Sequence, residues 1–224
     1  MKLQKSRKDE RMLLSDDAYR YIEQNYQPGE PVFLADLDIP EMTQVAVRQQ
    51  IGKLVEEGRL RRFDTGIYFI PKKTSFRSGS TLSMNDVIRE KYLLEDGKVC
   101  GYVGGLLFAN RLGLTTQVPA LYEVFTNKAS KEYRETKLGG IRVVVRRPYC
   151  RVDDGNVVVL RFLDLLKDVT AVSEVEGKEL TERLLGYMKR ERITFEAMDS
   201  FLPFYPERIY RNMYEAGLLV GRDA

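Results

Sequence analysis

The amino-acid sequence predicts an α+β protein in two parts. The first is a small domain of helices and a β-hairpin over residues 1–73, and the second is a mixed domain over residues 81–224 with a small antiparallel sheet and several helices. Three observations support this. A helix-period apolar stripe near residue 50 leads directly into two short alternating stretches. The polar stretch Lys72–Ser80 (KKTSFRSGS) has the composition of a linker. In the rest of the chain, one strand pattern and one hairpin pattern stand between groups of helical patterns.

The central element of the first part is a helix that begins after Thr43. Thr43 is a favourable N-cap, and it follows the Ile39-Pro40 step, which disfavours helix. Gly58 comes just after the last apolar turn and is expected to end the helix. The residues that share one face and point to a core are Val47, Ile51, Leu54 and Val55.

The opposite face of this helix has a composition that suits DNA recognition. A solvent-exposed face more often carries paired Glu and Lys, whereas this one carries glutamine, arginine and small apolar residues. Gln and Arg form paired hydrogen bonds to base edges, and an apolar side chain can contact a thymine methyl group. The candidates for base readout are Gln44, Val45, Arg48, Gln49 and Lys53.

A basic hairpin follows the helix. Its predicted strands are Arg59–Phe63 and Ile67–Ile70, joined by the three-residue loop Asp64-Thr65-Gly66. Positive side chains on such a hairpin are expected to contact phosphates. The candidates are Arg59, Arg61 and Arg62.

Two shorter helices would complete the first part. Ser15 is expected to cap one of them, and the other is predicted over Val32–Leu37. Three helices and a basic hairpin in this order predict a winged helix-turn-helix DNA-binding domain. The alternative interpretation is a compact helix–hairpin unit with a solvent-exposed basic edge.

The second part is predicted as a series of helices around one strand and one hairpin. Its glycine-rich stretch at residues 101–105 lacks the Lys-Ser/Thr of a phosphate-binding loop, so close helix packing is the preferred interpretation. The predicted strands are Leu121–Thr126, Tyr133–Leu138 and Ile141–Arg147. The predicted helices are Ser83–Leu94, Cys100–Leu114, Val157–Asp168, Glu179–Arg190, Phe195–Phe201 and Glu207–Ala216.

Positive charge is concentrated in one short stretch of the second part. Residues 128–151 contain eight basic and two acidic residues, a net charge of +6, whereas the whole chain carries +3. This predicts a second basic surface that contacts nucleic acid or an acidic partner. The alternative is a solvated sheet face with scattered charges. The residues of this surface are Lys128, Lys131, Arg134, Lys137, Arg142, Arg146 and Arg147.

Three short segments carry a resemblance to a known family. They are Asn110-Arg111-Leu112-Gly113-Leu114-Thr115, Thr126-Asn127-Lys128 and Leu138-Gly139-Gly140. Together with the N-terminal domain, the sequence resembles the AbiEi-like antitoxins of abortive-infection type IV toxin–antitoxin systems. The resemblance covers residues 81–170 of the second part, and it adds little for the C-terminal helices at residues 171–224.

The resemblance implies a transcriptional repressor that is also an antitoxin. The winged helix would bind inverted repeats in double-stranded DNA at the promoter of its own operon, as a homodimer or as two cooperating monomers. Base readout would fall on Gln44, Arg48, Gln49 and Lys53, with the hairpin arginines on phosphate. The C-terminal domain would counteract a nucleotidyltransferase-like toxin, and antitoxins of this kind need not form a stable complex with it.

Composition argues against several other classes. The chain has no histidine, and Cys100 and Cys150 have no metal-ligand spacing, so no enzyme activity, cofactor or metal is predicted. No stretch is long and apolar enough to span a membrane, and the N-terminus lacks a secretory signal, so we expect a cytoplasmic protein. Two alternatives remain. One is a nuclease in which Glu123 and Glu135-Thr136-Lys137 hold Mg²⁺, and the other is a protein-interaction adaptor.

Overall fold

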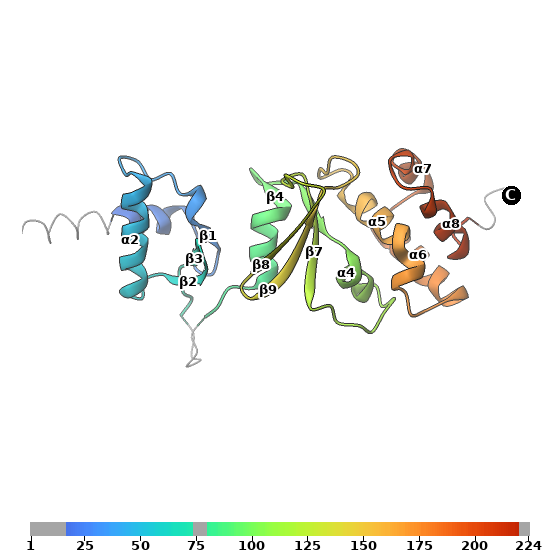
Figure 1. Cartoon of the computed structure of the whole chain (residues 1–224), viewed down its shortest axis with the longest axis horizontal. Coiled ribbons are helices and arrows are strands. Elements are labelled where there is room, and N and C mark those ends of the chain that lie inside the picture. Colours follow the sequence, from blue (N-terminus) through green and yellow to red (C-terminus); the bar gives the residue numbers. More distant parts are fainter. Residues whose placement is uncertain (1–16, 74–79, 220–224) are drawn as a thin grey trace, which may run out of the picture. The chain divides into compact units, whose positions relative to one another are not determined.

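The structure is a computed structural model that describes residues 17–73 and 80–219 (Figure 1). The chain divides into two compact units, Met1–Glu90 and Lys91–Ala224, and each has its own hydrophobic core. Both units combine helices with a small sheet, which confirms the predicted α+β class. The predicted cap Ser15 lies outside the described residues.

Unit 1 contains a three-stranded sheet in the order β1-β3-β2, with both pairs antiparallel. Residues 17–25 form its first helix. The remaining elements are β1 (Val32–Phe33), the 3₁₀-helix η1 (Leu34–Asp36), α2 (Gln44–Glu56), β2 (Arg61–Asp64), β3 (Ile67–Phe69) and α3 (Met84–Ile88).

Helix α2 forms as its sequence predicts. The Thr43 hydroxyl accepts a hydrogen bond from the Ala46 N–H at 3.2 Å, which satisfies one of the free donors of the first turn. Gly58 follows the C-cap residue Glu57, and its φ of 74° places Gly58 in the left-handed region. The apolar stripe lies in the core of unit 1, where Val47, Ile51 and Leu54 are fully buried.

Two predictions for unit 1 were wrong in detail. The helix predicted over Val32–Leu37 is a strand followed by one 3₁₀ turn, because Val32 and Phe33 pair with β3 instead of continuing a helix. The first hairpin strand begins at Arg61 rather than at Arg59. Asp64 pairs with Ile67, so the connecting loop is shorter than the predicted three residues.

Unit 2 contains a four-stranded sheet in the order β6-β7-β9-β8. The predicted antiparallel sheet was wrong in one respect, because β7 and β9 run parallel while the outer pairs are antiparallel. A separate two-stranded sheet is formed by β4 (Leu94–Glu95) and β5 (Lys98–Val99). The four strands of the main sheet are β6 (Gly101–Val103), β7 (Leu121–Thr126), β8 (Tyr133–Leu138) and β9 (Ile141–Arg146).

The helix predicted over Cys100–Leu114 was also wrong in its first part. Strand β6 occupies that part, and the helix α4 spans only Gly105–Arg111. The reason is close pairing with β7, since a Cβ atom on Gly101 would lie 2.5 Å from the Phe125 carbonyl oxygen. Gly101 therefore permits strand pairing, whereas Gly104 and Gly105 let the start of α4 lie close to the Phe125 and Glu123 side chains of β7, as the packing interpretation predicted.

The helix predicted over Ser83–Leu94 is interrupted. It consists of α3 and the π-helix η2 (Arg89–Leu93), and Leu94 already belongs to β4. The Ser83 side chain makes no capping hydrogen bond.

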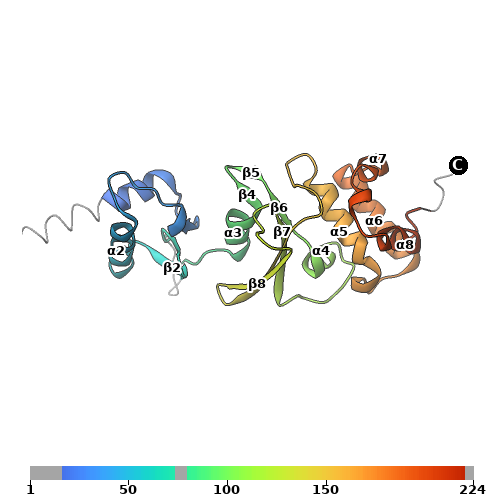
Figure 2. The same cartoon turned by 45° about the horizontal axis from the view of Figure 1, so that its top comes forward.

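The helices of unit 2 lie in layers beside the sheet. Helix α5 lies between the sheet and the C-terminal helices, as Figures 1 and 2 both show. Its largely apolar sequence fits this position, because Leu160, Phe162, Leu163 and Leu166 are all fully buried. The helices are α5 (Val157–Val172), α6 (Gly177–Glu191), α7 (Phe195–Asp199), the 3₁₀-helix η3 (Leu202–Phe204) and α8 (Arg208–Glu215). Among the described helices, none has the length and apolarity required to cross a bilayer.

Candidate functional site

The face of α2 opposite the core is open to solvent. Val45 is 64% exposed, and Arg48 and Gln49 are exposed beside it. A Cβ atom on Gly52 would meet nothing within 4 Å, so the middle of this face is recessed and unobstructed within unit 1. In residues 17–73 and 80–219, neither Arg48 nor Gln49 has a hydrogen bond or ion pair through its side chain. Their donors and acceptors are therefore available to a ligand.

The other two predicted base-reading residues are placed differently. The Gln44 amide N–H donates to the Leu37 carbonyl at 3.0 Å, which anchors this side chain to the segment before the helix. Lys53 is half-buried. Val45, Arg48 and Gln49 therefore form the more accessible part of the predicted set.

The three predicted hairpin arginines have contacts inside unit 1. Arg59 lies over the Tyr19 ring, with its guanidinium carbon 3.8 Å from the ring centroid. Arg61 Nη1 donates to the Ser80 carbonyl at 2.7 Å, and Arg62 Nη2 donates to the Thr65 hydroxyl at 3.0 Å. Arg61 and Arg62 remain exposed on β2, whereas Arg59 is half-buried and precedes it. The hairpin thus presents two of the three predicted cations.

The second predicted basic surface lies on two faces of the sheet in unit 2. Lys137 pairs with Arg142 in the register of β8 and β9, and Arg146 lies four residues further along β9 on the same face. Arg134 is opposite Val145 and so belongs to the other face. The basic residues therefore do not form the single surface that the sequence predicts.

Most arginines of this region are paired with carboxylates. Arg142 contacts Glu135 at 3.1 Å, and Arg147 contacts Glu132 at 2.7 Å. Arg146 pairs with Glu123 of the neighbouring strand β7. Lys128 Nζ donates to the Lys91 carbonyl at 3.4 Å, and Lys131 and Lys137 are exposed. The cross-strand pairs reduce the positive potential that the sequence suggests.

The carboxylates considered for a nuclease lie at one level of this sheet. Glu123 and Glu135 are both opposite Val144, on the strands at either side of β9. Each has an arginine partner, Arg146 for Glu123 and Arg142 for Glu135. Within the described ranges, no group of three Cys, Asp or Glu side chains is arranged to hold a metal ion. The arrangement is that of cross-strand ion pairs.

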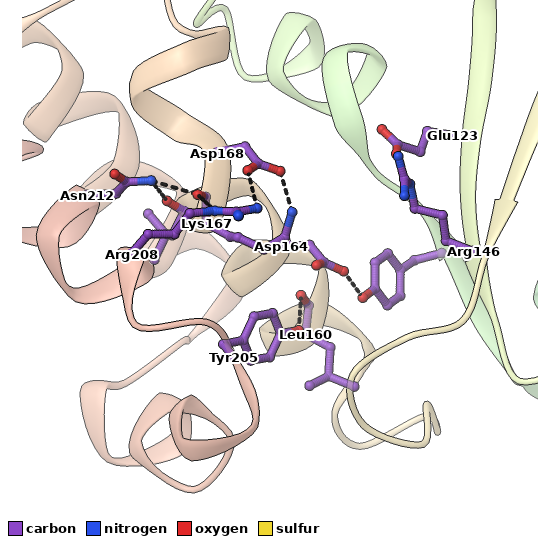
Figure 3. Close-up of polar contacts among 11 residues, drawn as sticks. Glu123, Arg146, Leu160, Asp164, Lys167, Asp168, Tyr205, Arg208 and Asn212 are labelled. Atoms are coloured by element: carbon purple, nitrogen blue, oxygen red, sulfur yellow. Dashed lines mark hydrogen bonds and ion pairs between the residues drawn. The ribbon is translucent and has the colours of Figure 1, made fainter. Parts of the chain in front are cut away.

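A polar cluster around α5, which reaches α8 on one side and the sheet on the other, is a feature that the sequence interpretation missed (Figure 3). Asp168 of α5 is held by Lys167 and by Arg208 of α8, the latter at 2.9 Å. Asn212 Nδ2 donates to the Leu166 carbonyl at 3.1 Å and to the Lys167 carbonyl at 2.6 Å. The signal was present in the sequence, since Asp164, Lys167 and Asp168 interrupt a largely apolar helix.

Asp164 is the most unusual member of this cluster. It is only 5% exposed, and its Oδ2 accepts a hydrogen bond from the Tyr102 hydroxyl. Burial raises the pKa of Asp164 from 3.8 to about 7, against the opposing effects of the Tyr102 hydrogen bond and of Lys167. Its Oδ1 is buried without a hydrogen-bond partner in the described structure. An unpaired buried carboxylate oxygen is rare enough to mark a candidate site.

No family model matches the chain, and a search of curated proteins gives no match.

Proposed function

We propose that the protein is a DNA-binding transcriptional repressor that acts as the antitoxin of a type IV toxin–antitoxin operon. It would autoregulate its promoter and counteract a nucleotidyltransferase-like toxin. One observation carries the DNA-binding part: α2 buries one face in the core of unit 1, while its other face presents Arg48 and Gln49 without partners in residues 17–73 and 80–219. A helix of this kind followed by a basic hairpin suits insertion into a major groove.

The order of elements in unit 1 supports a winged-helix arrangement. A helix, β1, η1, α2 and the β2–β3 hairpin follow one another, and the sheet order β1-β3-β2 ties the hairpin to the strand that precedes α2. The Leu34 N–H also donates to the Gly66 carbonyl at 2.9 Å, which holds the hairpin turn against that segment. The departure is the element before α2, which is a three-residue 3₁₀ turn where a helix-turn-helix has a full helix.

The proposed contacts divide into two kinds. Arg48 and Gln49 would read base edges, and Val45 would contact a thymine methyl group. Arg61 and Arg62 would contact phosphates, which fix the position of the protein on the duplex but carry little sequence information. Each phosphate contact releases counterions, so affinity should fall steeply as salt rises.

The antitoxin part depends on the family resemblance. The segments that carry it have structural roles in unit 2. Asn110 Nδ2 donates to the carbonyls of Thr115 at 3.1 Å and Gln117 at 3.0 Å, and Asn127 Nδ2 donates to the Val152 carbonyl at 2.8 Å. Gly139 and Gly140 both have positive φ in the β8–β9 turn. These residues hold loops in place, so neutralisation of a toxin would fall on other residues of this unit.

A binding titration tests the DNA proposal. The full chain is titrated into labelled DNA containing the inverted repeats of its own promoter and into a scrambled duplex. Arg48→Ala/Gln49→Ala should remove the preference for the promoter, whereas Arg61→Ala/Arg62→Ala should weaken binding to both duplexes alike. A promoter preference that survives the first double change would exclude α2 as the reading helix. Failure of the wild type to bind any DNA at low salt would favour the protein-interaction adaptor.

A growth assay tests the antitoxin proposal separately. The nucleotidyltransferase-like gene beside this one is induced in cells with and without the present chain under an independent promoter. We expect growth to be restored by the chain, and restored equally by Arg48→Ala/Gln49→Ala, because neutralisation is assigned to unit 2. Absence of rescue, or absence of such a gene, would contradict the antitoxin role and leave the DNA-binding result unaffected.

A further inference from the structure

A cavity lies in unit 2, beside the polar cluster of Figure 3. Its volume is about 390 Å³, within the range of small-molecule sites, which runs from roughly 300 to 1,000 Å³. Its wall is mainly apolar and comes from α4, β7, α5 and the segment before β7. The apolar lining consists of Leu106, Pro119, Leu121, Phe125, Leu165 and Val172.

The charged groups of this wall are all of one sign. Glu123, Asp164 and Asp168 line the cavity, and among the described residues no lysine or arginine does. The cations that pair with Glu123 and Asp168 are Arg146, Lys167 and Arg208, which line a neighbouring cleft that shares Glu123, Phe125 and Asp168 with the cavity. Among the described residues, Asp164 is therefore the carboxylate of this wall that has no ion pair.

Asp164 supplies the independent sign that something binds here. Its Oδ1 is buried and has no hydrogen-bond partner in the described part of the chain, although its Oδ2 is held by Tyr102. A buried polar atom left unpaired costs roughly 1–3 kcal/mol, so it is uncommon unless a ligand or water satisfies it. A cation at Oδ1 would satisfy the atom and compensate the burial of its charge.

We propose that this cavity binds a small organic amine, with the ammonium group against Asp164 and an apolar body along the Leu121 and Val172 side of the wall. The Tyr102 hydrogen bond fixes the Asp164 carboxylate, so Oδ1 is oriented before the ligand arrives. Nothing in this site depends on the DNA-binding proposal, because every lining residue lies in unit 2.

Calorimetric titration of the full chain at pH 8 tests the site with three probes that have the same number of carbon atoms, namely n-hexylamine, 1-hexanol and hexanoate. n-Hexylamine should bind at least tenfold more tightly than 1-hexanol, and hexanoate should bind more weakly than either. Equal affinities for the amine and the alcohol would overturn the proposal, since only the charge separates them. So would the absence of heat from n-hexylamine up to millimolar concentration.

Three variants locate the binding. Asp164→Asn should weaken n-hexylamine at least tenfold and leave 1-hexanol unchanged. Asp96→Asn is the matched control, because Asp96 is exposed in the β4–β5 turn with a φ of 49°, which asparagine tolerates, and it should change neither probe. Ala120→Trp adds bulk to an exposed wall residue and should abolish binding of both. Unchanged amine binding in Asp164→Asn would refute the assignment.

The wild-type protein gives a test that needs no variant. The pKa of Asp164, raised by burial to about 7, means that its carboxylate forms between pH 6 and pH 8, while an alkylamine stays protonated. Amine affinity should rise about tenfold over that interval and 1-hexanol affinity should not.

The groups that face Asp164 are Tyr102, Glu123, Cys150, Lys167, Asp168 and Tyr205. Burial raises the pKa of both tyrosines and of the Cys150 thiol, and the chain has no histidine to titrate in this interval. Amine affinity that does not change with pH would contradict the proposal.

Discussion

The exposed face of α2 and the β8–β9 hairpin both carry arginines, but they differ in what those arginines contact. In the described chain, Arg48 of α2 has no carboxylate partner. Arg142 and Arg146 of the hairpin are paired with Glu135 and Glu123. An arginine already held by a carboxylate must exchange that contact for a phosphate, so its net gain on binding DNA is small. A run of positive residues is therefore a weaker sign of a DNA surface than one unpaired arginine on a helix.

Asp164 of unit 2 is a buried carboxylate without an ion pair among the described residues, and a substitution there should produce the largest effect. Between pH 3.8 and about 7 the folded carboxyl keeps a proton that the unfolded chain has lost. The folded state therefore binds more protons, and this group makes stability fall as pH rises through that window. Asp164→Asn removes the ionisable group and with it this fall in stability. At pH 8 the free energy of unfolding of the variant should exceed that of wild type by up to about 4 kcal/mol.

Urea unfolding of both proteins at pH 4.5 and pH 8 measures this prediction. The advantage of Asp164→Asn should be small at pH 4.5 and large at pH 8, and Asp96→Asn should match wild type at both values. A constant difference between wild type and Asp164→Asn would show that Asp164 ionises equally in the folded and unfolded states.

The next prediction compares the two arginine environments directly. Arg48→Ala should reduce affinity for promoter DNA by about 1–3 kcal/mol, as expected for loss of a paired base contact. Arg142→Ala should change it by less than about 0.5 kcal/mol, because Arg142 is occupied by Glu135 at 3.1 Å. Fluorescence anisotropy at one fixed salt concentration measures both. A larger loss for Arg142→Ala would reverse the comparison and move the DNA surface to unit 2.

How far the sequence alone predicts this molecule depends on the range of the interactions involved. Helix α2 was predicted closely because Thr43, the apolar stripe and Gly58 are local signals that agree with one another. The hairpins were located by their turn glycines for the same reason. Segments whose structure depends on pairing with a distant strand were not predicted correctly. Strand β1 forms because β3 pairs with it, and β6 forms because β7 does.

The candidate sites show the same limit. Exposure of Val45, Arg48 and Gln49 follows from helical periodicity, so the sequence could predict it. The pairing of Arg146 with Glu123 could not be predicted, because it depends on the parallel register of β7 and β9. The cavity at Asp164 needs α4, β7 and α5 to be positioned together. Only the polar interruption of α5 pointed to it in advance.

A matched pair of helix caps sharpens the comparison between the units. Thr43 caps α2 in unit 1 and Thr194 caps α7 in unit 2, each accepting from a backbone N–H, at 3.2 Å and 3.1 Å. Replacing either with Ala should cost about 1 kcal/mol of unfolding free energy. Only Thr43→Ala should also weaken promoter binding, because it loosens the first turn of α2. Equal DNA affinity for the two variants would indicate that this turn does not contact the duplex.

The smallest effect is expected at Glu174, a carboxylate whose partners are again internal to unit 2. Glu174 Oε2 accepts from the Thr116 N–H at 2.7 Å and from its hydroxyl at 2.8 Å, and Oε1 accepts from Gln117 at 3.0 Å. The backbone and hydroxyl hydrogen bonds of Thr116 lower the pKa of Glu174 from 4.5 to about 2. Because the folded pKa is depressed, this stabilisation is present above pH 4.5 and is lost as pH falls towards 2.

Glu174→Gln should therefore lower the melting temperature slightly at pH 7, and the difference from wild type should vanish near pH 2. The effect stays small because the side chain is exposed to solvent. Glu182→Gln is the control, since Glu182 makes only a surface pair with Lys178 at 3.5 Å. Melting curves from pH 2 to pH 7 compare the three proteins. A difference that persists unchanged to pH 2 would mean that the charge of Glu174 does not hold the Thr116 loop, and that the hydrogen-bond geometry alone is sufficient.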